Sequence, residues 1–359
     1  MDGIDVALIR TDGKQRVERD AFGFYAYSHE TRELLQRALV DAVDITQRDQ
    51  RPGCLELAEK EITRLHIAAV KAFLADNRLS PEEIDYLGFH GQTVLHRPEK
   101  ALTVQLGDGA LLSKDTGIAT VFDMRANDMG HGGQGAPLIP VYHEALAKNV
   151  HGLTSIEGPI CFVNIGGISN ITFVGDELIA FDSGPGNALI DQWVQKHVGI
   201  SHDQGGAIAA EGNVDRPLVD SYLSDPFFEC DVPKSLDRND FVLPTASNLG
   251  VETVARSLAR VSAEAILKSA DHLPEFPAVW IICGGGRYNP HIMQDLFELA
   301  AAKNAQVLTA EDAGFNGDAM EAEGWAYLAV RASAGLPLTF PKTTGCRSAV
   351  SGGVISLPH

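Results

Sequence analysis

The chain has 359 residues, of which 45% are hydrophobic, and its formal net charge at pH 7 is -19. This length and apolar content are sufficient for two domains, each with its own core. The strong acidic charge argues against nucleic acid or an anionic membrane surface as the main partner.

The cysteines and the hydropathy pattern indicate a cytoplasmic protein. The five cysteines are dispersed along the chain and never have a C-x-x-C spacing, which favours a reducing compartment. No apolar run approaches the roughly 20 residues that a membrane-spanning helix needs, and no charged-then-apolar leader precedes the first strand. We therefore expect neither a membrane partner nor export.

The first part of the chain alternates between apolar strands and amphipathic helices. Strands are predicted at 4–10, 86–90, 103–106 and 118–124, and helices at 30–45, 55–77, 80–83 and 108–116. Such alternation predicts a mixed or parallel α/β sheet.

Polar residues cluster where these strands end, which is where open α/β sheets bind ligands. The candidates are His90, Gln92, Asp123 and Arg125. Arginine at such a position suits a carboxylate or phosphate partner. A structural ion pair for Arg125 and an ordinary loop histidine at His90 remain alternatives at this stage.

The glycine-rich segment 130–137 predicts the crossing into a second domain. We expect domain I to span 1–128 and domain II to span 129–335. Residues 336–359 are expected to return to domain I and complete it.

The central stretch 161–187 predicts three strands, at 161–164, 171–174 and 178–181, followed by a helix at 188–198. Glycine turns separate them, and backbone N–H groups exposed by such turns bind anionic oxygens. Asp182 lies at a strand end, where a carboxylate suits general-base chemistry. The alternative is a set of ordinary hairpin turns, with Asp182 capping the helix.

A less regular region follows, in which residues 234–238 are predicted as a polar loop that lies only at the surface. Helices are predicted at 252–269, 290–303 and 318–334, and strands at 278–283 and 306–308. Asn289 is expected to cap the second of these helices, and the third carries Glu321. The glycine triplet 284–286 suits a nucleotide base or sugar lying against the backbone, with close helix–sheet packing as the alternative.

Two α/β halves, each beginning with a glycine-turn hairpin, are thus expected to face each other across a cleft. In the first half, Asp2-Gly3 would be the turn and residues 4–9 the returning strand. This duplicated arrangement resembles the superfamily of sugar kinases, acetate kinases, actin and heat-shock chaperone ATPases. The resemblance implies two actin-like, ribonuclease H-like domains with mixed sheets flanked by helices, and ATP phosphates held between the hairpin turns.

Several motifs together resemble one family, the anhydro-N-acetylmuramic acid kinases, over essentially the whole chain. These motifs occupy residues 1–8, 88–93, 105–108, 133–138, 164–170 and 181–187. The resemblance implies an enzyme of cell-wall recycling that opens 1,6-anhydro-N-acetylmuramic acid with water. It then phosphorylates O6 with ATP and Mg²⁺, giving N-acetylmuramic acid 6-phosphate.

The resemblance also implies roles for individual residues. Asp182 matches the catalytic aspartate, which activates the attacking water. Glu321 and Arg125 would meet the sugar, Arg125 at its lactyl carboxylate, together with His90 and Gln92. The nucleotide side would comprise Asp2, Gly3, Asp5, Asn164, Gly166, Gly167, Gly184, Gly186, Gly284, Gly285 and Gly286. No side chain is assigned as a direct metal ligand, because Mg²⁺ between phosphates keeps several waters; a homodimer is implied.

The beginning of the sequence departs from the family pattern, which has Ser-Gly-Thr-Ser and a strand before the Met-Asp-Gly. We expect the start to have been set too late in the gene model, so that the first phosphate-binding loop is missing from this polypeptide. Two alternatives stay open: a kinase for another anhydro sugar such as levoglucosan, and a truncated sugar- or nucleotide-binding protein without turnover.

Overall fold

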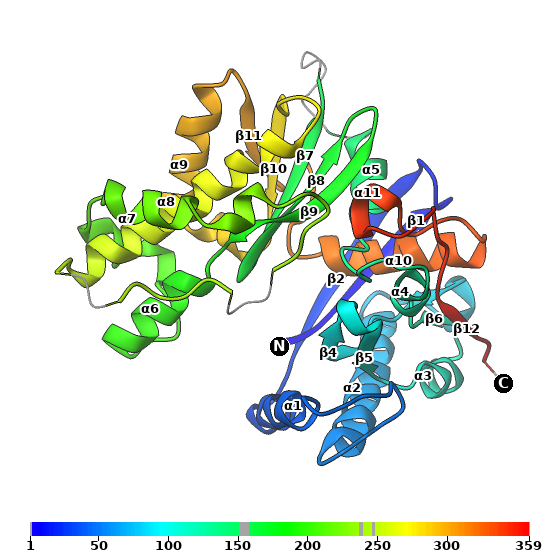
Figure 1. The fold of residues 1–359 in the computed structure, drawn as a ribbon. Helices are drawn as coiled ribbons and strands as arrows, with labels where there is room; N and C mark the ends of the chain where they lie inside the picture. The colour runs from blue at the N-terminus through cyan, green and yellow to red at the C-terminus, as the bar shows by residue number, and fades with distance from the viewer. Residues whose placement is uncertain (1, 149, 151–157, 237–239, 246–247, 359) are drawn as a thin grey trace. The chain divides into compact units, whose positions relative to one another are not determined.

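The computed structural model describes residues 2–148, 150, 158–236, 240–245 and 248–358. The chain forms two compact units (Figure 1). Unit 1 comprises Met1–Lys148 and Ala319–His359, and unit 2 comprises Asn149–Asp318. No helix in the described part of the chain combines the length and apolarity needed to cross a membrane.

Unit 2 is built on a five-stranded mixed sheet with the order β11-β10-β7-β8-β9. The strands are β7 (Ile160–Ile165), β8 (Ile168–Val174), β9 (Leu178–Pro185), β10 (Val279–Cys283) and β11 (Gln306–Thr309). The first three form an antiparallel meander, and β10 and β11 run parallel to β7. In chain order this is 3-2-1-4-5, the ribonuclease H-like topology. The predicted α/β class with a mixed sheet is therefore confirmed.

Helices cover this sheet because its strands are apolar on both faces. Helix α8 (Val251–Lys268) packs against β8 and β9 and also contacts α6 (Ala188–Val198), α7 (Arg216–Leu223) and α9 (Pro290–Ala301). Short 3-10 helices complete the unit: η3 (Gln204–Gly206), η4 (Ala209–Glu211), η5 (Pro226–Glu229), η6 (Ser269–His272) and η7 (Gly285–Tyr288).

Unit 1 contains three small sheets. The strands are β1 (Gly3–Thr11) with β2 (Val17–Ala26), β4 (Gln92–Arg97) with β5 (Leu102–Leu106), and β3 (Leu87–Gly88), β6 (Thr120–Phe122) and β12 (Val354–Ser356) in the order β12-β6-β3. The helices are α1 (His29–Asp41), α2 (Leu55–Asp76), α3 (Gly109–Thr116), α4 (Ala126–Gly130), α5 (Pro140–Ala147), α10 (Met320–Ser333) and α11 (Pro341–Thr344), with the 3-10 turns η1 (Pro81–Glu83) and η2 (Pro98–Lys100).

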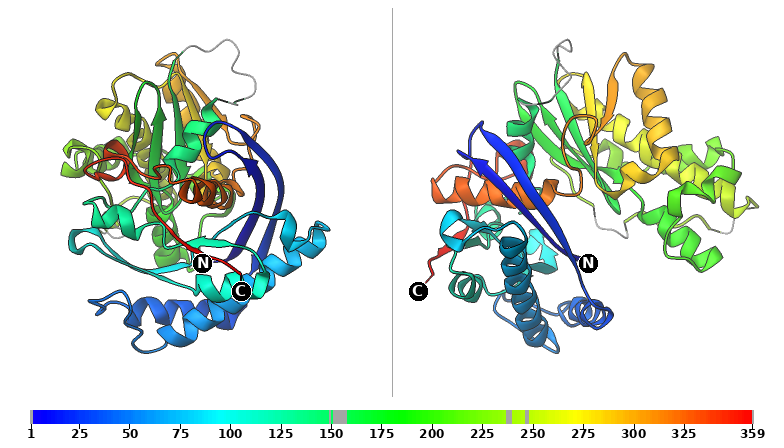
Figure 2. Two further views of the ribbon diagram at one scale, coloured as in Figure 1. Left: turned by 90° about the vertical axis from the view of Figure 1, so that its right-hand side faces the viewer. Right: turned by 180° about the vertical axis from the view of Figure 1, so that it is seen from behind.

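Helix α10 organises unit 1. It lies across the β1–β2 hairpin and also contacts β3 and β6 (Figure 2). On another side, α2 buries Leu55, Ala58 and Ile62 in a cluster with residues of α1 and β5. This is the apolar face that the helical spacing predicted.

Most predicted elements are present, and several ends differ. The α1 helix stops at Asp41 rather than at residue 45. The strand predicted at 86–90 is reduced to Leu87–Gly88, and the one at 118–124 to Thr120–Phe122. Gly3 belongs to β1 instead of a turn, and β9 continues through Gly184 and Pro185. Local apolarity does not reveal where pairing partners end, which explains these differences.

The compact units have different boundaries from the predicted domains 1–128 and 129–335. Helix α5 and helix α10 both belong to unit 1, where Tyr142 Oη–H of α5 donates to Glu323 Oε2 of α10 at 2.6 Å. The C-terminal tail folds onto the same unit, because β12 pairs antiparallel with β6.

We predict that Gly88→Ala destabilises the protein by about 1–3 kcal/mol, because overpacking forces backbone apart. A Cβ at Gly88 would lie 2.1 Å from the Trp325 carbonyl oxygen, which belongs to α10. The matched control is Gly130→Ala in α4, where nothing lies within 4 Å of the added atom. Urea unfolding measures both free energies, and equal stability of the two variants would refute close β3–α10 packing.

Candidate functional site

Asp182 is set by an irregularity in β9. Asn170 of β8 pairs with Asp182, whereas the neighbouring Ser169 pairs with Gly184, so that Ser183 is an extra residue. The two serine hydroxyls lie 2.8 Å apart and fix this bulge. A β-bulge re-aims the adjoining side chain and is common beside active sites. Asp182 is thus the last regularly paired residue of β9 before the bulge.

A short segment, residues 234–236, holds Asp182 from two directions. The Asp182 backbone N–H donates to the Lys234 carbonyl at 3.0 Å. The Leu236 N–H donates to Asp182 Oδ2 at 2.8 Å. The alternative that Asp182 caps the following helix is therefore wrong, because its acceptor is engaged by Leu236 and the residue at the cap of α6 is Asn187.

Burial raises the pKa of Asp182 to about 6, with the Leu236 N–H acting in the opposite direction. A carboxylate whose pKa lies close to neutrality is a stronger proton acceptor than an exposed aspartate, yet it is still mostly ionised at neutral pH. The side chain can therefore take a proton from water or a hydroxyl group.

The prediction that residues 234–238 form a loop lying only at the surface is wrong for Lys234. This side chain is 8% exposed. Its ammonium donates to the carbonyl oxygens of Phe227 and Phe228, at 2.9 and 3.1 Å. Asp237 and Arg238 lie outside the described residues.

The glycine turns of unit 2 meet at the carboxyl ends of β7, β9 and β10. The Gly186 N–H donates to Gly167 O at 2.9 Å, and the Asn187 N–H donates to Gly166 O at 2.8 Å. A Cβ at Gly186 would lie 2.4 Å from Gly166 O. Glycine is thus required at this position because two backbone turns touch each other.

The triplet that follows β10 packs against the same group. A Cβ at Gly284 would lie 2.3 Å from Asn164 Oδ1, and one at Gly286 would lie 2.1 Å from Ile165 Cγ2. A Cβ at Gly285 would have no atom of another residue within 4 Å, its chain neighbours apart. Close packing therefore explains the outer two glycines, and the middle one presents open backbone. Gly184 is placed differently, since its Cβ position faces Ala265 of α8 at 2.8 Å.

In unit 1, His90 and Arg125 form a pair beside Trp325. Arg125 Nε and Nη2 lie 3.2 and 3.0 Å from His90 Nε2, and the imidazole stacks on the Trp325 indole with 4.4 Å between ring centroids. Burial, with the Arg125 charge, holds the pKa of His90 well below its usual value. The neutral ring can therefore accept from the guanidinium and orient it.

Arg125 is a partly buried cation with little local compensation. Its Nη1 donates to Gly135 O at 2.7 Å. Burial lowers the pKa of Arg125 to about 10, with Glu321 and Asp128 opposing that effect, so it stays charged at neutral pH. No carboxylate within the described residues forms an ion pair with it at 4 Å or less. Such a guanidinium suits a bound carboxylate.

The remaining predicted residues have distinct places. Glu321 is exposed in the first turn of α10, one turn before Trp325, which brings it into the electrostatic surroundings of Arg125. Gln92 begins β4, and its amide donates to Thr93 O at 3.1 Å. Asp2 and Asp5 are exposed at the start of β1. Gly3 faces Phe24 of β2, where a Cβ would lie 2.5 Å from the ring.

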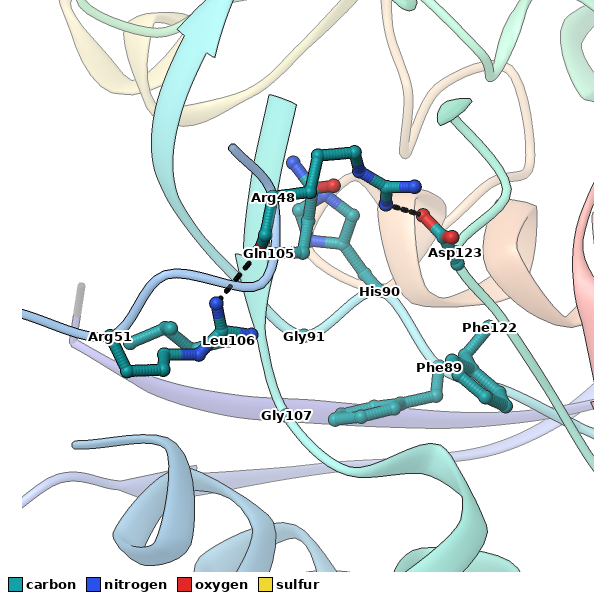
Figure 3. Close-up of a pocket in the computed structure, with 10 residues that line it drawn as sticks. All are labelled: Arg48, Arg51, Phe89, His90, Gly91, Gln105, Leu106, Gly107, Phe122 and Asp123. Carbon is teal, nitrogen blue, oxygen red and sulfur yellow. Dashed lines mark hydrogen bonds and ion pairs between the residues drawn. The ribbon is translucent and has the colours of Figure 1, made fainter. Parts of the chain in front are cut away.

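A cavity of about 170 Å³ adjoins His90 in unit 1 (Figure 3). Its two arginines are already paired: Arg48 with Asp123, and Arg51 with Glu59. Asp123 adopts a left-handed backbone with φ of 54°, a conformation that aspartate tolerates better than most residues. Among the described residues, no partner satisfies the buried Gln105 Oε1. This oxygen remains available to a donor on a ligand.

Sequence reasoning missed Trp325, Lys234 and Gln105. The spacing of Trp325 four residues after Glu321 was a usable signal, since such residues share a helix face. Nothing local indicated that Lys234 is buried, because it lies among polar residues. His90, Arg125 and Glu321 belong to unit 1, whereas Asp182 and the glycine turns 166–167, 186 and 284–286 belong to unit 2.

Comparison with known proteins gives one consistent family. The family model described as anhydro-N-acetylmuramic acid kinase matches residues 1–358. A protein of that name from Agrobacterium fabrum is 54% identical over 357 residues, covering 99% of this chain and 95% of the relative. Relatives of the same name from Brucella canis and Rhizobium johnstonii are 56% and 52% identical, with 99% and 100% of this chain covered and 95% and 96% of theirs.

We predict that Asp182→Asn stabilises the folded protein at about pH 8, by on the order of 2 kcal/mol. The pKa of Asp182 is raised in the folded state, from the ordinary aspartate value of 3.8 to about 6. The fold therefore favours the protonated acid, and this contribution is lost as pH rises from the lower value through the higher one. Asparagine keeps an oxygen to accept from Leu236 without the buried charge.

Denaturant unfolding of both proteins across this pH range measures the effect. The wild type should approach the variant in stability as the pH falls below about 4. A difference that does not vary with pH would show that burial of the Asp182 charge is not costly.

Proposed function

This chain belongs to the anhydro-N-acetylmuramic acid kinase family, and we propose that it opens 1,6-anhydro-N-acetylmuramic acid with water and phosphorylates O6 with ATP. The product is N-acetylmuramic acid 6-phosphate. The observation that carries the proposal is the family match over residues 1–358. It is supported by the raised pKa of Asp182, which suits the general base that this reaction requires.

In this mechanism Asp182 accepts a proton from the water that attacks the anomeric carbon. The bond between that carbon and O6 breaks, and its electron pair goes to O6. The O6 oxygen then attacks the γ-phosphorus of ATP, and ADP leaves. The proton on Asp182 returns to solvent after the product departs. The Leu236 N–H, at 2.8 Å from Oδ2, keeps the carboxylate oriented throughout.

The nucleotide binds to the glycine turns of unit 2 in this proposal. The residues are Asn164, Gly166, Gly167, Gly184, Gly186, Gly284, Gly285 and Gly286. Nothing lies within 4 Å of a Cβ built at Gly285, so its open backbone suits a flat base or sugar. Gly184 contributes indirectly, by letting β9 approach α8.

We further propose that Mg²⁺ accompanies ATP and keeps most of its waters. The ion would be bound mainly by phosphate oxygens and water, as is usual for Mg²⁺ in kinases. The exposed Asp2 and Asp5 would contact its waters, beside Gly3. The ion would neutralise phosphate charge during transfer.

The sugar is recognised by unit 1 in the proposal. Arg125, oriented by His90 and Gly135, binds the lactyl carboxylate, and Glu321 and Gln92 bind polar groups of the sugar. We also propose a homodimer and a cytoplasmic location. The location is supported by the absence of any disulfide among the five cysteines.

The function itself is tested by a coupled assay of ADP release on the full-length protein. We expect turnover with 1,6-anhydro-N-acetylmuramic acid and little with levoglucosan, which lacks the acetamido and lactyl groups. Preference for levoglucosan would replace the proposed substrate with a simpler anhydro sugar.

Asp182→Asn is expected to lower kcat by about 100- to 10,000-fold, the usual contribution of a general base. ATP affinity, measured by calorimetry, should stay close to that of the wild type. In the wild type, kcat/KM should fall as the pH drops below about 6, because protonated Asp182 cannot accept a proton. The control is Asp176→Asn, an exposed aspartate in the turn between β8 and β9.

Arg125→Met is expected to lower kcat/KM for the lactyl substrate by about 10- to 100-fold, the size of one charge-assisted hydrogen bond. The same substitution should lower kcat/KM much less for 1,6-anhydro-N-acetylglucosamine, because this sugar lacks the lactyl carboxylate. The exposed Arg347→Met serves as the control in the same unit. Equal losses with both sugars would assign Arg125 a structural role only.

A further inference from the structure

Lys234 is an unusual residue in unit 2, because lysine is almost never fully buried without a carboxylate partner. It is 8% exposed. Among the described residues no Asp or Glu forms an ion pair with its ammonium within 4 Å; the nearby Lys268, by comparison, pairs with Glu229 and Asp271. The cost of burying this charge calls for a function that a hydrophobic residue would not serve.

The ammonium of Lys234 is held by the short helix η5. It donates to Phe227 O at 2.9 Å and to Phe228 O at 3.1 Å, which are carbonyls of a helical turn and carry partial negative charge. It also lies 4.6 Å from the centre of the Phe227 ring, a cation–π distance. These three contacts hold the end of the Lys234 side chain in place.

His272 completes the cluster. Its Nε2 lies 3.1 Å from the Lys234 ammonium and 2.7 Å from Phe228 O. The Nε2 nitrogen cannot accept a hydrogen bond from the ammonium and donate one to Phe228 O at the same time. The shorter contact favours a proton on Nε2, donated to Phe228 O. The His272 ring also meets Phe181, the residue before Asp182, edge to face at 5.9 Å.

The backbone of the same segment holds Asp182. The Lys234 carbonyl accepts from the Asp182 N–H at 3.0 Å, and the Leu236 N–H donates to the carboxylate at 2.8 Å. Both contacts depend on where the segment 234–236 lies, and the Lys234 side chain is what ties that segment to η5.

We propose that Lys234 is a positioning residue for Asp182: its ammonium anchors the segment 234–236 to η5, and the anchored backbone orients the carboxylate. The consequence for turnover rests on the proposed function, whereas the placement of the carboxylate does not. Lys234 does not touch the reacting atoms in this account.

The titratable groups that surround this arrangement in the described residues are few. Lys234 and His272 both lie against the ring of Phe181, the residue before Asp182. Glu229, Cys230 and Lys268 act electrostatically on Lys234. The strand beside Asp182 presents Asn170, which does not titrate.

The test is a carbon-13 titration of the aspartate carboxyl groups in the full-length protein, in which the Asp182 signal is identified by its loss in Asp182→Asn. Lys234→Met should raise the titration midpoint of Asp182 by about one pH unit, a tenfold change in proton affinity. Leu236→Pro, which removes the N–H donor but keeps the lysine, should raise it similarly. Lys268→Met, at a half-buried neighbour that pairs with Glu229 and Asp271, should leave it unchanged.

A wild-type midpoint in folded Lys234→Met, together with a raised midpoint in Leu236→Pro, would overturn the proposal. If Lys234→Met does not fold, Lys234→Gln decides, because it keeps a hydrogen-bond donor without the charge: a midpoint near that of the wild type, with a raised midpoint in Leu236→Pro, supports the anchor, and a raised midpoint in Lys234→Gln assigns the effect to the lysine charge and refutes it. The acid limb of the rate profile should move with the midpoint. Absence of any sugar-dependent ADP release in the wild type would refute the proposed function. The titration would still decide whether Lys234 positions Asp182.

Discussion

The hydrogen bond from the Leu236 N–H to Asp182 is the interaction on which the chemistry of unit 2 depends. A carboxylate at a buried strand end is costly to ionise, and a fully desolvated one would remain protonated. One backbone donor at 2.8 Å offsets part of that cost. The result is a pKa of about 6, at which the group is ionised in neutral solution and still basic. The segment 234–236 lies beside Asp182, because the Lys234 carbonyl also accepts from the Asp182 N–H.

Glycine serves two different purposes in the same unit. At positions 186, 284 and 286 it is required because turns from separate strands pack against one another, with Cβ positions blocked at 2.4 Å or less. At position 285 the backbone is open. The tightly packed glycines hold the turns rigidly together, and this framework fixes the position of the open backbone at Gly285.

Much of the fold could be predicted from the sequence, because apolar periodicity identifies helices such as α2 and α6 almost to the residue. The ends of β3 and β6 could not, since strand length depends on partners elsewhere in the chain. The limits of the compact units also differ from those of the domains predicted from the sequence. The Tyr142–Glu323 bond, which ties α5 to α10, joins residues 181 positions apart, and no local pattern carries such information.

Candidate site residues could be predicted from the sequence where they lie in recognisable motifs. Asp182, Arg125 and the glycine turns stood out by residue type and by their place after strands. Lys234 did not, because a lysine among polar residues reads as a surface group, and only the packing of η5 and His272 around it shows that it is buried. Trp325 likewise became a candidate site residue only when the structure showed its stacking on His90.

The central claim, that water opens the anhydro bridge and O6 then receives the phosphoryl group, is tested most directly by running the reaction in oxygen-18-labelled water and quenching with borohydride. The account predicts one labelled oxygen on the anomeric carbon of the sugar and none in the phosphoryl group. Label in the phosphoryl group, or an unlabelled anomeric oxygen, would contradict it.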